Sequence, residues 1–168
     1  DDFVEAGAGS TVFPAAQDAL NALTDSLFYL DGELKDMKLA EPAGLLNCTE
    51  ALCPDQREFL WEDISFEAIA ANLDGFRAVF TGGEGLGFDD LLADAGQEAL
   101  ANDMLAAVDA AHEAALGQTG TMAEVLASDP DAVVALHGKV KALTDLLKTQ
   151  FLSVLDLELP LRAEGDND

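Results

Sequence analysis

The chain has 168 residues, with 33 acidic residues against eight lysines and arginines and a formal net charge of −25. This charge excludes nonspecific nucleic-acid binding and docking on an anionic membrane surface, because both need a cationic face. Apolar residues make up 49% of the chain, which excludes a disordered acidic tail and predicts one compact domain, over residues 1–168, beneath an acidic surface that maintains solubility.

No apolar run reaches the length of a membrane span, and no signal peptide is visible. Residue 1 is Asp rather than Met. We therefore expect a processed, truncated or cut form of a longer chain, and an upstream signal or lipid anchor stays open.

The first predicted helix begins at Pro14, a residue suited to a first helical turn, and ends before Pro42. Gly32 interrupts it late. Its apolar positions alternate steps of four and three residues, which is the spacing of one helix face: Ala16, Leu20, Leu23, Leu27, Leu30, Leu34 and Met37.

Residues 40–62 are predicted to form a loop that carries both cysteines, Cys48 and Cys53. Four intervening residues suit a small looped disulfide, and paired cysteines in an otherwise cysteine-free chain favour an oxidising compartment. Two free thiols are the alternative; a zinc site would need two further ligands. We expect Leu60 and Trp61 to fix the far end of the loop against the rest of the domain.

The second predicted helix opens near Asp63 or Ser65, either of which can cap it, and ends at Thr81-Gly82-Gly83. A short helix over 88–95, a long helix over 97–116 and a short turn over 121–127 follow. The last long helix begins at Pro130, after the capping residue Asp129, and ends before Pro160; the tail over 163–168 is expected to fray. The three long stripes are Phe66, Ile69, Leu73, Phe76 and Phe80; Leu100, Met104, Val108, Ala111 and Ala115; and Val133, Leu136, Val140, Leu143, Leu147, Phe151 and Val154.

No stretch alternates apolar and polar residues as a half-buried strand does. Four long helices with one apolar face each must bury those faces together. The sequence therefore predicts an all-α fold, an antiparallel up-down four-helix bundle with short extra helices.

Few residues suggest chemistry. Asp109 and His112 have the spacing of one helical turn, similar to the carboxylate and histidine ligands of di-iron bundles, and His137 lies on the next long helix. These three are weak metal-ligand candidates, and packing of both histidines at the edge of the core is the alternative. The sequence contains neither a Gly-x-Ser-x-Gly elbow nor a His-Glu-x-x-His motif, so we assign no catalytic residue. The glycine-rich segment over 83–90 lacks the lysine of a phosphate loop and is expected to be a tight connection.

Four segments, in order, resemble the imelysin family, also called peptidase M75. They are Lys38-Leu39-Ala40-Glu41-Pro42-Ala43-Gly44-Leu45, similar to Lys-Leu-x-x-Pro-x-Gly; Ser65 to Phe76, similar to Ser-x-x-x-Ile-x-x-Asn-Leu-x-Gly; Phe80-Thr81-Gly82 with Gly85 to Leu92; and Leu143 to Leu155 with the closing Gly165-Asp166. The resemblance covers most of residues 20–168 and corresponds to the C-terminal half of a typical member.

The resemblance implies two helical bundles packed together, export to the periplasm or cell surface, and a link to iron uptake. The hallmark Gly-x-His-x-x-Glu of the family, proposed as a metal site, belongs to the N-terminal half and has no counterpart here. Any iron or other divalent metal would therefore be bound through the missing half. We expect a non-catalytic binding domain; the alternative is a fragment of a metallopeptidase whose active residues lie outside this chain.

The expected partner is the missing N-terminal half or a second copy of the chain. The last long helix has a wide apolar stripe, which predicts an apolar surplus on the surface: Leu143, Leu146, Leu147, Phe151, Val154 and Leu155. A compact monomer whose short helices cover that surplus is the alternative.

Overall fold

The structure is a computed structural model that describes residues 2–164, and no strand occurs among them. The four long helices are α1 (Ala16–Leu27), α2 (Ser65–Phe80), α4 (Glu98–Leu116) and α6 (Pro130–Leu146). The shorter helices α3 (Phe88–Asp94) and α5 (Met122–Ser128) lie in the connections on either side of α4, and α7 (Leu152–Val154) follows the last long helix. Two π-helical segments, η1 (Leu30–Ala40) and η3 (Leu147–Phe151), continue α1 and α6. Two single 3-10 turns, η2 (Pro54–Gln56) and η4 (Leu161–Ala163), complete the set.

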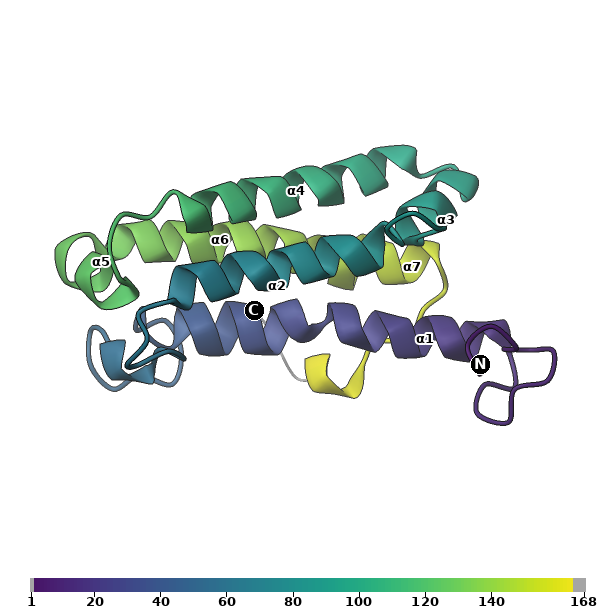
Figure 1. The fold of residues 1–168 in the computed structure, drawn as a ribbon, viewed down its shortest axis with the longest axis horizontal. Helices are drawn as coiled ribbons and strands as arrows, with labels where there is room; N and C mark the ends of the chain where they lie inside the picture. Colours follow the sequence, from purple (N-terminus) through teal and green to yellow (C-terminus); the bar gives the residue numbers. More distant parts are fainter. Residues whose placement is uncertain (1, 165–168) are drawn as a thin grey trace.

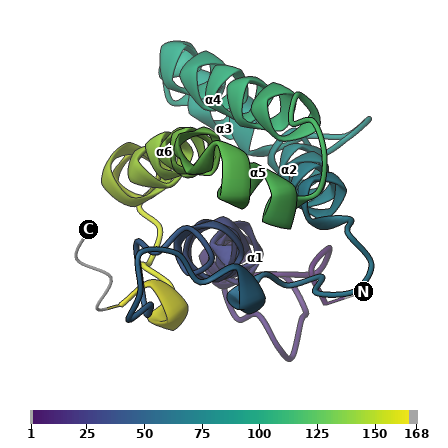
Figure 2. The same cartoon turned by 90° about the vertical axis from the view of Figure 1, so that its left-hand side faces the viewer.

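The long helices run alternately up and down, which confirms the predicted bundle (Figure 1). Viewed along the bundle, α1 with η1 lies across from α4, and α2 and α6 fill the two sides between them (Figure 2). The helix pairs α2 and α4, α4 and α6, and α6 and η1 pack closely. Helix one contacts α2 less extensively, mainly through η1, and α1 itself lies against α2 at few points. The side between helix one and α2 is therefore the more loosely packed one, above all along α1.

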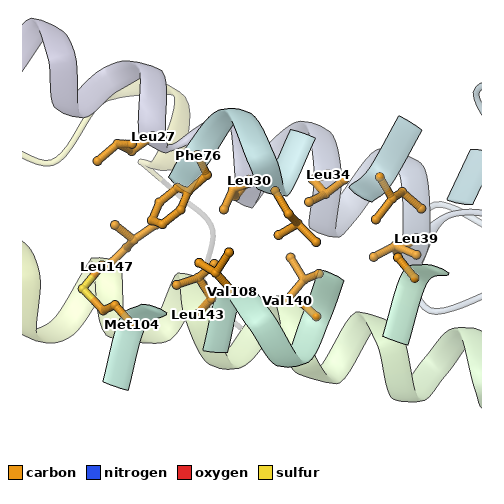
Figure 3. Close-up of a cluster of buried hydrophobic side chains, with 14 of the residues drawn as sticks. Leu27, Leu30, Leu34, Leu39, Phe76, Met104, Val108, Val140, Leu143 and Leu147 are labelled. Atoms are coloured by element: carbon orange, nitrogen blue, oxygen red, sulfur yellow. The ribbon is translucent and has the colours of Figure 1, made fainter. Parts of the chain in front are cut away.

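The apolar stripes predicted for the second and third long helices are buried in full, and so is the stripe of the last one as far as Phe151. Figure 3 shows how these side chains meet: Leu27, Leu30 and Leu34 from helix one face side chains of the three other long helices, among them Phe76, Met104, Val108, Val140 and Leu143. A straight helix repeats its inward face every three to four residues, and on these helices the sequence spacing follows that repeat.

The first predicted helix ends before Pro42, as expected, but it is not α-helical throughout, and Ala16, Leu23 and Met37 of its predicted apolar stripe are exposed. The structure begins the helix at Ala16, where the Asp18 carboxylate accepts a hydrogen bond from the Ala15 N–H at 2.8 Å. It then widens into η1, where bonds span five residues, as from the Glu41 N–H to the Asp36 carbonyl at 2.9 Å. The wider turn shifts the inward face, so that Lys38 and Leu39 are buried and the predicted Met37 is exposed.

The last helix ends before Pro160, as predicted. It passes through η3, finishes at Val154, and is followed by a segment that packs along helix one. The Gln17 amide donates to the Asp156 carbonyl at 2.8 Å, and Arg162 lies 3.3 Å from Asp25 and 3.2 Å from Glu33. Ala163 is buried, so the predicted fraying does not begin there; residues 165–168 lie outside the described residues.

Three further local predictions are wrong. Ile64 occupies the capping position of α2 and no side chain caps that helix, so neither Asp63 nor Ser65 does. Pro130 opens α6 as predicted, but the Asp129 side chain makes no capping bond. Trp61 is 84% exposed and does not fix the loop, whereas Leu60 is half-buried.

Candidate functional site

The metal-ligand candidates on α4 are paired with α2 rather than with each other. Asp109 forms an ion pair with Arg77, and His112 Nε2 lies 3.3 Å from the Oδ1 atom of Asp74. Both pairs cross between two helices that pack closely along their length. Their geometry is that of interhelical surface contacts that fix the register of α2 against α4.

The third candidate, His137, lies in a different environment. It lines a shallow hollow of about 240 Å³ with Asp36, Lys141 and the exposed Leu45 and Leu46. The structure therefore places His137 against η1 and the following loop, and places His112 against α2. Within residues 2–164 no group of three His, Cys, Asp or Glu side chains could hold a metal ion, so the described residues do not fit a metal centre of their own.

The disulfide prediction is confirmed: Cys48 and Cys53 are bonded, with their Cα atoms 5.9 Å apart. The Cys53 N–H donates to the Pro42 carbonyl at 3.1 Å and ties the loop back to the end of η1. Gly44 allows this close return, because it has a positive φ of 77° and a Cβ there would collide with the Ala51 carbonyl. Glu58, in the segment that follows the disulfide and η2, lies against Lys38 of helix one.

A hollow lies on the loosely packed side of the bundle, between helix one and α2. This hollow of about 300 Å³ is lined by both helices of that side, including Tyr29, Asn72, Gly75 and Val79. It shares Val79 with an apolar hollow of about 230 Å³ (Leu20, Leu23, Val79, Leu86, Gly87, Phe88, Leu91) and shares Tyr29 with one of about 170 Å³ (Tyr29, Glu33, Met37, Lys38, Glu41, Gln56, Glu58). We call these three hollows together the α1–α2 groove.

Lys38 is a buried cation at one end of the α1–α2 groove. Its side chain is only 9% exposed, and its ammonium donates to the Asn72 Oδ1 atom at 2.7 Å and lies 2.9 Å from Glu58 Oε2. The same ammonium lies 5.1 Å from the centre of the Tyr29 ring, within range of a cation–π contact. A buried cation is stable only when paired in this way. One lysine thus joins η1, α2 and the segment that follows the disulfide at a single point.

A second buried ionic cluster went unnoticed in the sequence. Asp31 and Lys35, each 1% exposed, lie 3.1 Å apart, and Lys148 from η3 lies 2.8 Å from the other carboxylate oxygen of Asp31. Lys35 also contacts Asp36 at 3.4 Å. An ion pair between Asp31 and Lys148 therefore joins the two π-helical segments. Asp31 and Lys35 are spaced one helical turn apart, which indicates an ion pair. The same spacing is typical of exposed ion pairs, so it does not predict that this pair is buried.

A protein-family model described as Imelysin, of the peptidase M75 group, matches residues 4–150. The chain belongs to the imelysin family. Neither the curated proteins nor the solved structures returned a match. None of the helices in the described part of this imelysin-family chain is both long and apolar enough to cross a membrane.

Three of the four imelysin-like segments meet in the α1–α2 groove. Lys38 opens the first segment and Asn72 belongs to the second, and their side chains bond to each other. Gly75 of the second segment lines the groove, and so do Leu86, Gly87, Phe88 and Leu91 of the third. The stretches that carry the family resemblance thus converge on one surface.

Proposed function

We propose that this chain is a non-catalytic binding domain of an exported imelysin-like protein linked to iron uptake. One observation carries the proposal: segments far apart in the sequence, through which the chain resembles the family, come together in the α1–α2 groove. A groove lined mainly by apolar side chains, with a few placed polar groups, is the usual form of a binding site.

Export is supported by the disulfide, since such bonds persist in oxidising compartments. The link to iron and the assignment of this chain to the C-terminal half of a two-bundle protein rest on the family resemblance. On that assignment the missing N-terminal half supplies any iron or other divalent metal. The link to iron can be tested by measuring the transcript that encodes this chain, which should rise under iron limitation.

The second candidate is a fragment of a metallopeptidase, favoured by the peptidase class to which the matching family belongs. In that case the active residues lie outside this chain. Asp109, His112 and His137 would then serve packing and interhelical pairing rather than metal binding.

A hydrolysis assay separates the two candidates. The purified chain is incubated with a mixed peptide library, with and without added zinc or iron, and the products are read by mass spectrometry. We expect no cleavage under any condition. Cleavage that appears with a metal and disappears with a chelator would overturn the non-catalytic proposal.

A further inference from the structure

We infer that the α1–α2 groove binds a cationic amphipathic helix of a partner protein. This inference deepens the proposed binding role and rests on it, because it names the chemistry of the bound partner. The argument begins with apolar side chains that the bundle does not use.

The groove is where helix one carries more apolar surface than the core covers. Leu23 and Val79, each 38% exposed, face it from α1 and α2, and Met37 and Leu86 are more exposed still. The surplus predicted for the last helix does not occur there: Leu143, Leu147 and Phe151 are buried, and Leu146, Val154 and Leu155 pack partly buried against the core. Exposed apolar side chains also occur elsewhere, such as Trp61 and Leu116, but the groove gathers four of them, Leu23, Met37, Val79 and Leu86, along one face of helix one.

The shape of the groove favours a helix as its occupant. Its two long walls are helix one and α2, whose backbone groups are bonded within each helix, and no strand borders it among the described residues, so an extended segment would find no strand edge to pair with. The groove follows helix one from Leu20 to Met37, which at 1.5 Å per residue is about 25 Å. A partner helix of some four to five turns would match that length.

The charge of the groove selects a cationic partner. The end beyond Tyr29 is lined by Glu33, Glu41 and Glu58. Glu58 pairs with the lining cation, Lys38, and Glu33 shares Arg162 with Asp25, whereas Glu41 accepts a hydrogen bond from the neutral Asn47 amide and forms no ion pair among the described residues. The opposite end is lined by apolar side chains and one glycine. A partner helix with one apolar face, and with lysine or arginine toward one end, complements both ends of the groove. A second copy of this chain, at a net charge of −25, would be repelled.

Fluorescence anisotropy of the whole chain with a labelled probe tests the inference. The probe is a leucine–lysine peptide of about 17 residues with leucine on one helical face. The same composition in scrambled order and the same pattern with glutamate in place of lysine serve as comparison peptides. We expect the patterned cationic probe to bind, the scrambled peptide to bind at least about tenfold more weakly, and the acidic peptide not to bind.

Matched variants locate the site. The double variant Leu23→Gln, Val79→Gln should bind the probe about tenfold or more weakly than wild type. The control Val134→Gln, at a position 37% exposed on α6, should bind the probe with unchanged affinity. The double variant Glu41→Gln, Glu58→Gln should have a lower affinity for the probe, and that affinity should depend less on salt concentration. The control Glu98→Gln, Glu113→Gln on α4 should change neither the affinity nor its salt dependence. Circular dichroism of each variant confirms folding.

The inference is overturned if no probe binds, if the acidic or scrambled peptide binds equally, or if the groove variants match their controls. Sedimentation that shows a dimer lost in the Leu23→Gln, Val79→Gln variant would also overturn it, in favour of a second copy. Cleavage of the probe would instead overturn the proposed non-catalytic function. Loss of binding without cleavage contradicts only the cationic-helix partner.

Discussion

At the scale of single residues, Asp31 is a buried carboxylate that lies between the ammonium groups of Lys35 and Lys148. Each ion here has lost most of its hydration, and its partners replace the lost water. We expect Asp31→Asn to lower the free energy of unfolding by about 3 kcal/mol. This is the low end for a broken buried pair, because Lys148 is partly exposed and Lys35 retains Asp36.

Urea denaturation at neutral pH measures this loss. The matched control is Asp145→Asn, which breaks the more exposed pair of Lys141 and Asp145 at 2.9 Å. That change should cost less than about 1 kcal/mol, because exposed pairs are screened by solvent. Equal losses for the two variants would contradict the role assigned to Asp31.

At the scale of elements, the start of α5 is held by a reciprocal cap. The Thr121 N–H donates to the Glu124 carboxylate at 2.8 Å, and the Glu124 N–H donates to the Thr121 hydroxyl at 3.2 Å. The Glu124 carboxylate has a pKa below its ordinary value of 4.5. The hydrogen bond from the Thr121 backbone N–H is the main cause, and a hydrogen bond with the Thr121 side chain adds to it. Because the folded pKa is the lower one, this contribution is present above pH 4.5 and is lost as the pH falls through the folded pKa.

The expected result is a stability difference between wild type and Glu124→Gln that is present at neutral pH and shrinks below pH 4.5. Denaturation series between neutral and acidic pH measure it. A difference that stays constant, or grows with acid, would contradict the cap as described.

The loop that follows η1 is the element most dependent on a covalent bond. Without reductant, thiol titration should find no reactive thiol at Cys48 or Cys53. Reduction should lower the free energy of unfolding by about 2 kcal/mol, the loop-closure term for so short a loop. Two reactive thiols in the untreated protein would remove the support for export.

The elements also show what the sequence could predict. The stripes of α2 and α4, and that of α6 as far as Leu143, follow the repeat of a straight helix and are buried as expected. Helix one departs from that repeat because buried charges, Asp31, Lys35 and Lys38, lie on its inward side and read as polar in the sequence. The α1–α2 groove depends on distant contacts such as Lys38 with Asn72, which local spacing does not encode.

At the scale of the whole molecule, the net charge of −25 dominates. Exposed acidic groups repel one another, and salt screens this repulsion over a Debye length of about 8–10 Å. We expect the melting temperature to rise from millimolar to molar sodium chloride, since eight bases cannot pair with 33 acids. A flat or falling melting temperature would mean that specific ion pairs outweigh the general repulsion.

The central claim for the whole molecule is that its binding surface is the α1–α2 groove. Amide chemical shifts of the labelled chain, followed by nuclear magnetic resonance during titration with the cationic leucine–lysine peptide, test this claim most directly. The account predicts the largest shifts at Leu23, Val79 and Leu86, with little change at Val134 on α6. Shifts concentrated on α4 and α6, with the groove residues unchanged, would contradict it.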